Sequence, residues 1–203
     1  MKVLIVDYGM GNLGSLRRSL EECGADVSIS VNPSEVRAAA RVILPGVGAF
    51  PDAMATLRER GWVAELEGAV KAQVPLLGIC LGMQLLAEKG YEGEETTGLG
   101  FVPGEVRRLQ PASREIRLPH VGWNEARQVR SSPLFAGVAD RTDFYFVHSY
   151  HFAAKRPEDV LTTTDYCGGF ASTVSSGTTF GVQFHPEKSS RAGFQVIRNF
   201  LRL

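Results

Sequence analysis

The sequence predicts an α/β fold, in which helices flank a doubly wound, mostly parallel sheet that carries additional antiparallel strands. Over the first 80 residues, short apolar runs alternate with helical patterns, as repeated β-α-β units require. The run VPLLGI (74–79) is apolar at nearly every position, which is typical of a central strand covered on both faces. After about residue 100, short β-type runs separated by turn residues predict antiparallel strands. A chain of 203 residues suits one core, so we expect a single domain over 1–203.

The expected elements follow in order along the chain. The first helix has Asn12 as its cap and ends at Gly24, and its leucines recur every three or four positions. A closing helix begins at Ser189 and carries Phe194, Ile197 and Leu201 on one face. The other helical segments lie near 34–40 and 50–72, and the strands are expected in 2–6, 26–31, 41–44, 74–79, 101–109, 144–150, 160–166 and 170–184.

Composition excludes several classes of function. Lys plus Arg and Asp plus Glu are both 22, so no basic excess indicates binding to nucleic acid or to an anionic membrane. The apolar run before Asp7 is too short for a signal peptide, and the sequence contains no 18-residue apolar run, so we expect a cytoplasmic protein. Three cysteines and four histidines show neither disulfide nor metal-ligand spacing, so we expect no metal.

One motif invites a nucleotide-binding interpretation. GMGNLG (9–14) matches the dinucleotide fingerprint G-x-G-x-x-G, and it follows a strand and opens a helix as that fingerprint requires. The ribose-binding acid expected roughly 20 residues later is replaced by Val31-Asn32-Pro33. We therefore interpret 9–14 as a tight strand-to-helix loop at the carboxyl edge of the sheet, where partners and ligands also bind.

Cys80 stands in the pattern G-x-C-x-G, between Gly78 and Gly82. Glycines two residues before and after a nucleophile allow a strand to turn sharply into a helix, which exposes the side chain at the top of the sheet. The positive end of the helix favours the reactive thiolate, and the N–H of Leu81 lies where it can bind an oxyanion. A buried structural cysteine is the alternative, and the two glycines favour the nucleophile.

A thiolate nucleophile needs a base, and FHPE (184–187) supplies His185 with Glu187 two residues later. In an extended segment these two side chains point to the same side, so Glu187 can accept from one imidazole nitrogen while the other faces Cys80. Pro186 stiffens this spacing. The sequence therefore predicts a Cys-His-Glu triad for acyl transfer.

The elbow GICLGMQ (78–84), the loop LPGVG (44–48) and the closing FHPE resemble the motifs of class I glutamine amidotransferases, and they span almost the whole chain. The resemblance implies a flavodoxin-like fold and hydrolysis of the side-chain amide of L-glutamine, with the ammonia passed to an acceptor. It implies that Cys80 is the nucleophile, His185 the base and then the acid, and Glu187 the residue that orients His185. It implies no cofactor.

The resemblance also assigns the substrate-binding residues. The 45–48 loop would form the oxyanion hole, Gln84 would reach the substrate, and Glu92 would take the α-ammonium, although a solvated acid is the alternative for Glu92. We expect the peptide near Val47 to rest with its N–H turned away from the oxyanion and to turn over when a partner binds. The expected residues are Gly46, Val47, Gly48, Leu81, Gln84, Glu92, His148, Ser149 and Tyr150.

Finer signals resemble one branch of the family, the glutaminase subunits of histidine biosynthesis. These signals are DYGMGN (7–12), CLGMQ (80–84), LPHVGWN (118–124) and HPEKS (185–189). In that branch the ammonia passes to a separate (β/α)8-barrel cyclase subunit, and the two chains form a heterodimer. Trp123 suits either a core or an interface, because tryptophan favours both. The expected interface residues are Tyr8, Met10, Asn12, Trp123, Asn124 and Lys188.

Three other functions stay open at this point. Another amidotransferase subunit would serve anthranilate or aminodeoxychorismate synthesis and would differ in its acceptor. A free-standing cysteine hydrolase would act at full rate without a partner. A non-catalytic regulatory relative would keep the fold, and an unreactive Cys80 would identify it.

Overall fold

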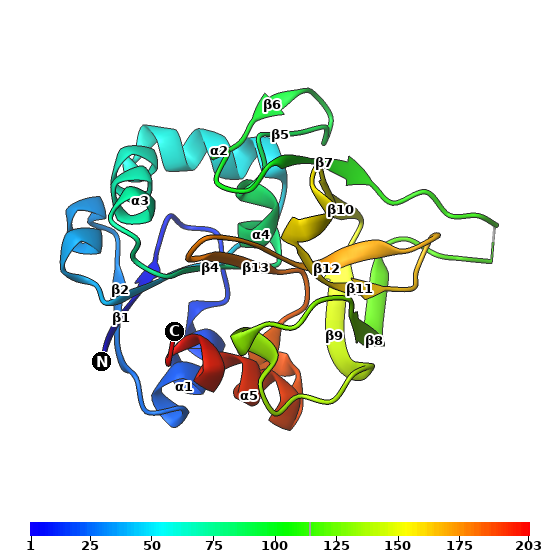
Figure 1. Ribbon diagram of the computed structural model, residues 1–203. Coiled ribbons are helices and arrows are strands. Elements are labelled where there is room, and N and C mark those ends of the chain that lie inside the picture. The colour runs from blue at the N-terminus through cyan, green and yellow to red at the C-terminus, as the bar shows by residue number, and fades with distance from the viewer. Residues whose placement is uncertain (114) are drawn as a thin grey trace.

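A computed structural model describes residues 1–113 and 115–203. A twisted sheet runs through the centre of the molecule, with helices on both of its faces (Figure 1). Its parallel part has the order β2-β1-β3-β4-β13, and every neighbouring pair in it is parallel. These strands are β1 (Lys2–Val6), β2 (Asp26–Ser30), β3 (Arg41–Leu44), β4 (Leu76–Ile79) and β13 (Thr179–Val182).

The sheet continues through antiparallel strands, as the second half of the sequence predicts. β12 pairs antiparallel with β13 and is followed by β10 and β7. A branch from β12 leads through β11 and β8 to β9, and β8 lies in register with β9 from His120 opposite His148 to Ala126 opposite Thr142. The bounds are β5 (Lys89–Gly90), β6 (Thr96–Thr97), β7 (Gly104–Arg108), β8 (His120–Gln128), β9 (Thr142–His148), β10 (Tyr150–Ala154), β11 (Val160–Thr164) and β12 (Phe170–Ser176).

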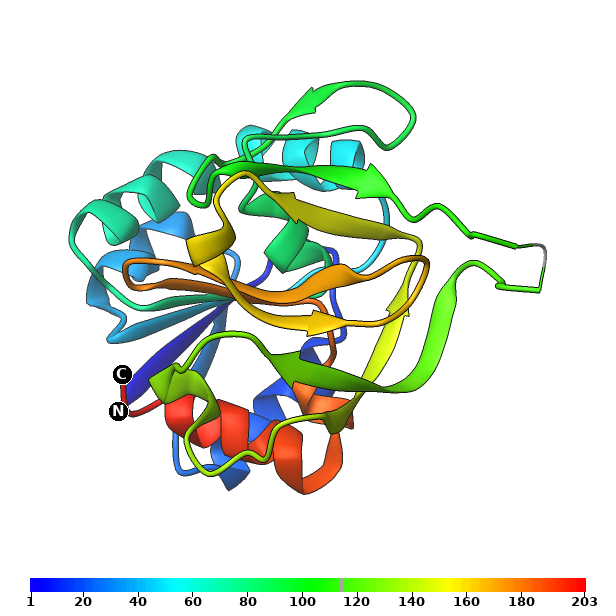
Figure 2. The same cartoon turned by 45° about the vertical axis from the view of Figure 1, so that its right-hand side comes forward.

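Two cores lie on opposite faces of the sheet. Helices α2 (Phe50–Glu59), α3 (Trp62–Lys71) and α4 (Leu81–Leu85) cover one face, and α1 (Leu13–Glu22) and α5 (Ser190–Phe200) cover the other (Figures 1 and 2). Alternate side chains of β1 enter the two cores, Leu4 and Val6 on the first and Val3 and Ile5 on the second. This two-sided burial explains why β1, β3 and β4 are apolar at nearly every position, whereas β2, at the edge of the sheet, has the mixed sequence DVSIS.

Some predicted elements differ from those observed. The helical segment 50–72 is two helices, because Gly61 adopts φ +75° between them. The segment near 34–40 is a 3₁₀ helix (Pro33–Ala38), and Asn12 precedes α1 without a side-chain cap bond. Strand β8 was not predicted, and Phe194, expected on one helix face with Ile197 and Leu201, is only half-buried whereas those two are buried.

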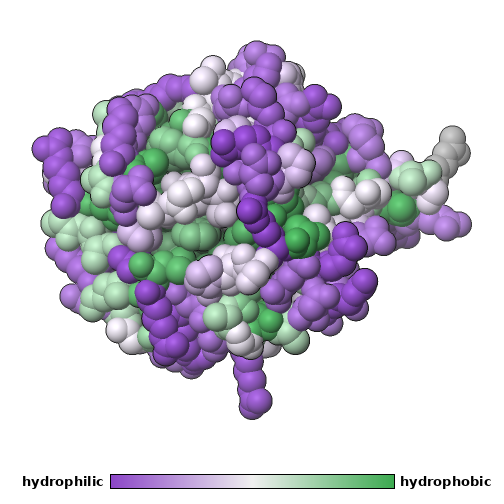
Figure 3. All heavy atoms as spheres, viewed as in Figure 1, coloured by the Kyte–Doolittle hydropathy of each residue, from purple (hydrophilic) through white to green (hydrophobic). Residues whose placement is uncertain are grey.

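The outer surface is mainly hydrophilic, as expected for a chain with 22% charged residues. Hydrophilic side chains cover much of the face seen in Figure 3, with smaller apolar patches among them. Residues 109–113 and 115–119, between β7 and β8, project from the body, and the two termini lie close together (Figures 1 and 2). None of the helices within the two described ranges has the length and hydropathy needed to cross a membrane.

We predict that Gly82→Ala lowers the free energy of unfolding by about 3 kcal/mol or more. A Cβ at Gly82 would lie 1.8 Å from the carbonyl oxygen of Leu44, so β3 and α4 must separate. Gly14→Ala is the matched control, because a Cβ there meets nothing within 4 Å and alanine favours the helix by about 0.5–1 kcal/mol. Urea unfolding checks both variants, and equal midpoints would contradict the packing argument.

Candidate active site

Cys80 occupies a strained corner between β4 and α4. Its backbone has φ 54° and ψ −111°, a conformation that costs a side-chain-bearing residue about 1–3 kcal/mol. A Cβ at Gly78 would lie 2.5 Å from the carbonyl oxygen of Gly82, so neither glycine of the motif can be replaced without movement. The predicted glycine-flanked turn is confirmed. Glycine is required at both positions because a Cβ at either one would overlap neighbouring backbone atoms.

The helix that follows Cys80 is short. α4 comprises five residues, so its dipole is small and contributes little to the stability of a thiolate. The N–H groups of its first residues, Leu81 and Gly82, still have no partner within the helix, as at any helix start. The Cys80 side chain is 7% exposed, and its chemistry therefore depends mainly on the groups packed around it.

His185 reaches this corner because β13 is the neighbour of β4. The two strands are parallel with Val182 opposite Ile79, and the N–H of Cys80 donates to the carbonyl oxygen of Val182 over 2.8 Å. Carboxyl ends of parallel strands lie at one edge of a sheet, so Cys80 and His185 both follow their strands into the same cavity. Ser189 fixes the backbone by donating its hydroxyl to the carbonyl oxygen of His185 over 2.6 Å.

The predicted contact between His185 and Glu187 is present, with 2.9 Å between Nδ1 and Oε1. The geometry differs from the expected extended segment, because residues Pro186–Lys188 form a 3₁₀ turn that brings the carboxylate back to the ring. Both side chains are buried, at 6% and 4% exposure.

Electrostatics favour a charged imidazole at His185. Burial lowers its pKa, but the side-chain hydrogen bonds to Cys80 and Glu187 and the charges of these groups outweigh burial and raise the pKa to about 9. Nε2 is buried without a well-aligned hydrogen-bond partner among the described residues. Such contacts are often loose in a resting enzyme and tighten with substrate.

Cys80 and His185 line a cavity of about 310 Å³. It is large enough for a small polar molecule and open at one end, and most of its walls come from positions that the sequence analysis selected. Pro119 and Val147 also line it and were missed, because neither carries a chemical group that marks a site. The lining residues are Val47, Gly48, Cys80, Leu81, Gln84, Glu92, Pro119, Val147, His148, Ser149, Tyr150 and His185.

The loop 45–48 has a buried half and an exposed half. Gly46 is buried between Tyr8 and Leu81, where a Cβ would lie 2.6 Å from the Tyr8 hydroxyl. Val47 is 46% exposed, and Gly48 adopts φ +107°. Gly46 therefore supports the loop from below and does not line the cavity, whereas Val47 and Gly48 do line it.

Gln84 and Glu92 are both tied to the protein at the cavity wall. Gln84 is buried, and its Nε2 donates to the carbonyl oxygen of Tyr150 over 2.9 Å and to Oε1 of Gln183 over 3.0 Å. Glu92 is half-buried and accepts from the N–H of Phe50 over 2.8 Å. Neither residue is the freely solvated side chain considered as the alternative.

Two further histidines, His148 at the cavity wall and His120 beside it, are hydrogen-bonded to each other. Nδ1 of His148 donates to the carbonyl oxygen of Tyr150 over 2.7 Å, so its Nε2 accepts from Nδ1 of His120 over 3.1 Å. Burial lowers the pKa of both rings, to about 3 for His148 and about 4 for His120. Nε2 of His120 then accepts from Asn124 over 3.3 Å, so a neutral hydrogen-bonded chain runs from Asn124 to the cavity wall.

The residues expected at a partner interface differ in their exposure to solvent. Trp123 is 52% exposed and contacts the Tyr145 ring edge-to-face, and the Lys188 ammonium lies 5.7 Å from the centre of the same ring. Asn12 is exposed, whereas Met10 and Asn124 are only partly so. Tyr8 is 1% exposed and donates its hydroxyl to the carbonyl oxygen of Pro45, so the expectation that Tyr8 is a surface contact is wrong.

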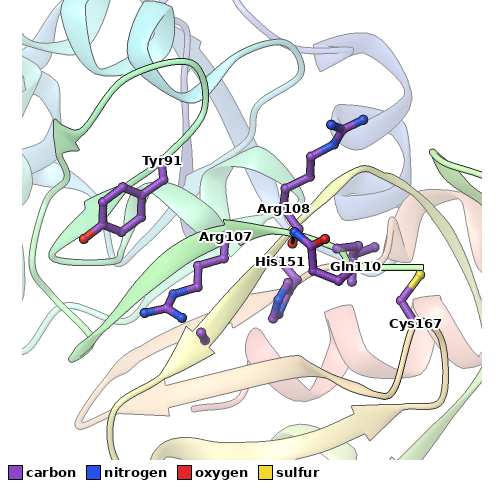
Figure 4. Close-up of a pocket in the computed structure, with 8 residues that line it drawn as sticks. Tyr91, Arg107, Arg108, Gln110, His151 and Cys167 are labelled. Atoms are coloured by element: carbon purple, nitrogen blue, oxygen red, sulfur yellow. Dashed lines mark hydrogen bonds between the residues drawn. The ribbon is translucent and has the colours of Figure 1, made fainter. Parts of the chain in front are cut away.

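A larger hollow of about 740 Å³ lies elsewhere (Figure 4). His151 lines it, and His151 follows Tyr150 on β10, so it faces the opposite side of the strand from the cavity with Cys80. Figure 4 shows Arg107 and Arg108 pointing away from each other and Cys167 across the hollow from His151. These residues form no nucleophile-base pair, so this hollow does not fit the predicted acyl-transfer chemistry.

Comparison with known proteins agrees with this geometry. Residues 4–203 match the family described as glutamine amidotransferase class-I. The chain is 51% identical over 198 residues to the imidazole glycerol phosphate synthase subunit HisH of Moorella thermoacetica, with 98% of this chain and 93% of that protein covered. It is 48% identical over 208 residues to the same subunit of Chromobacterium violaceum, with 99% and 97% covered.

Solved structures confirm the fold. A glutamine amidotransferase crystal structure matches with a TM-score of 0.76 at 19% identity, covering 98% of this chain and 97% of that one. The structure of PurLQS from Thermotoga maritima matches with a TM-score of 0.78 at 19% identity, covering 99% and 97%. The chain belongs to the class I glutamine amidotransferase family over nearly its full length, and within that family it is similar to the imidazole glycerol phosphate synthase HisH subunits.

Proposed function

We propose that this chain, as one domain, is the glutaminase subunit of imidazole glycerol phosphate synthase, which hydrolyses glutamine and passes ammonia to a barrel cyclase in histidine biosynthesis. The observation that carries the proposal is that Cys80 and His185 line one cavity and that Glu187 contacts His185, in a chain 51% identical to a HisH subunit. We further propose that the two chains work as a heterodimer in the cytoplasm.

The first half-reaction forms a thioester. The Cys80 thiolate attacks the amide carbon of the glutamine side chain, and the developing oxyanion is bound by the N–H of Leu81 and by the loop at Val47. The imidazolium of His185 donates its Nε2 proton to the departing nitrogen, so ammonia leaves as a neutral molecule. Glu187 keeps Nδ1 protonated throughout, which directs the transferable proton to Nε2.

The second half-reaction restores the Cys80 thiolate. Neutral His185 accepts a proton from water, which attacks the thioester carbon, and the Cys80 thiolate leaves as glutamate forms. The imidazolium–thiolate pair is then ready for another cycle. These steps use only side chains, backbone N–H groups and water.

The cavity supplies recognition at both ends of glutamine. Both hydrogens of the Gln84 amide are used by Tyr150 and Gln183, so its Oε1 is the atom available to accept from the substrate. The Glu92 carboxylate lies at the same wall and suits an α-ammonium, while the Ser149 and Tyr150 backbone suits the α-carboxylate end.

Cys80→Ser is expected to lower glutamine hydrolysis by at least about 10⁴-fold, because the nucleophile cannot be replaced by a second group. Cys167→Ser is the matched control, since Cys167 lines the larger hollow and is expected to keep the wild-type rate. Release of glutamate is the measurement. Equal losses in both variants would contradict the assignment of Cys80.

The alkaline limb of the pH profile of kcat/KM is expected near pH 9. The pKa of His185 is raised above its ordinary 6.5, so the imidazolium persists through neutral pH and is lost as pH rises through about 9. Glu187→Gln removes a charge that raises this pKa, so the limb moves to lower pH. Glu125→Gln, in an exposed ion pair with Arg141, is expected to leave the limb in place.

Partner activation tests the assignment of the acceptor. Glutamine hydrolysis is expected to rise when the barrel cyclase and an analogue of its phosphorylated substrate are both added. Trp123→Ala is expected to weaken the complex by about tenfold or more, whereas Val31→Ala, exposed beside β2 at the far edge of the sheet, leaves affinity unchanged. No response to the cyclase would favour another acceptor or a free-standing hydrolase.

A further inference from the structure

Gln183 is a fully buried polar residue that the reaction described above leaves without a role. It follows β13, and it is 0% exposed. Its backbone N–H donates to the carbonyl oxygen of Ser172 over 2.9 Å, which continues the pairing of β13 with β12. The side chain is therefore held at the base of the cavity by the same strand that delivers His185.

The side-chain amide of Gln183 has a defined orientation. Gln84 uses its NH₂ group on two acceptors, the carbonyl oxygen of Tyr150 and Oε1 of Gln183. Because Oε1 of Gln183 accepts from Gln84, its NH₂ group must point the other way. Nε2 of Gln183 lies 3.7 Å from Sγ of Cys80, a distance suited to an N–H···S hydrogen bond.

The surroundings of the thiol show why this donor matters. Among the described residues, Sγ also contacts the carbonyl oxygen of Val147 at 3.8 Å, which accepts from a thiol but repels a thiolate. When Cys80 gives its proton to His185, this contact turns unfavourable. Gln183 then provides a second side-chain N–H donor to the sulfur, beside the imidazolium of His185.

We propose that Gln183 is a positioning residue that stabilises the Cys80 thiolate by donating its amide N–H, with its orientation fixed through Gln84 from the carbonyl oxygen of Tyr150. The proposal rests on the proposed glutaminase function and extends it. Gln84 and Tyr150 line the substrate cavity, so the residues that contact the substrate also hold the donor that prepares the nucleophile.

The test compares two substitutions of Gln183 with a control on the same strand. Gln183→Glu keeps the shape but replaces the donor with a carboxylate, and Gln183→Leu removes the donor. Thr179→Val is the control, because Thr179 is fully buried on β13 and its hydroxyl has no partner among the described residues. The readouts are the pH profile of Cys80 alkylation by iodoacetamide, followed on the Cys80 peptide by mass spectrometry, and kcat and KM for glutamine.

Both Gln183 variants are expected to move the alkylation profile to higher pH by about one unit or more, which is tenfold slower alkylation below the midpoint. Their kcat is expected to fall by about tenfold or more with a smaller change in KM, whereas Thr179→Val keeps the wild-type profile. Unchanged profiles in folded Gln183 variants would overturn the proposal. Alkylation needs no glutamine, so it judges the contact even if the chain fails to hydrolyse glutamine.

A measurement on the wild-type chain avoids any dependence on the folding of variants. The side-chain amide resonances of Gln183 are expected to shift with pH together with the alkylation of Cys80, and to lose this response after Cys80 is alkylated. Side-chain amide resonances that do not respond to either change would refute the proposed hydrogen bond.

Discussion

The parallel pairing of β4 with β13 is the constraint on which the site depends. The two strands are separated by about 100 residues in the chain, and strands β5 to β12, which include the antiparallel partner of β13, lie between them in sequence. The register Ile79 opposite Val182 brings Cys80 to His185, and the N–H of Cys80 bonds directly to β13. A slip of this register would turn every following side chain to the other face of the sheet and separate the pair.

The strained turn at Cys80 persists because the surrounding structure leaves it no alternative. The backbone conformation costs about 1–3 kcal/mol, and burial of β4 between two cores offsets this cost many times over. Gly82 lets α4 touch the carbonyl oxygen of Leu44, and Gly46 lets the neighbouring loop pack under Leu81. Cys80 and the 45–48 loop are thus positioned by close backbone contacts that only glycine permits.

Three histidines near the cavity are driven to different charge states by their partners. His185 faces a carboxylate and a thiol, so its pKa is raised, whereas burial lowers the pKa of His148 and His120, and the charge of neighbouring histidines, His185 among them, lowers that of His148 further. The neutral pair can then form a hydrogen-bonded chain of fixed direction from Asn124 to the carbonyl oxygen of Tyr150. The same oxygen accepts from Gln84, so the chain ends at the residue that holds Gln183.

Most of the helices and strands could be predicted from the sequence, because periodicity and spacing are local properties, whereas β8 was not predicted. Apolar periodicity predicted the parallel strands, glycine spacing predicted the turn at Cys80, and the short span from His185 to Glu187 predicted their contact. Three features became known from the three-dimensional structure: the strand that lies beside β4, the burial of Tyr8 and the orientation of the Gln183 side chain. These features depend on contacts between residues far apart in the chain, and neither spacing nor composition encodes which distant segments meet.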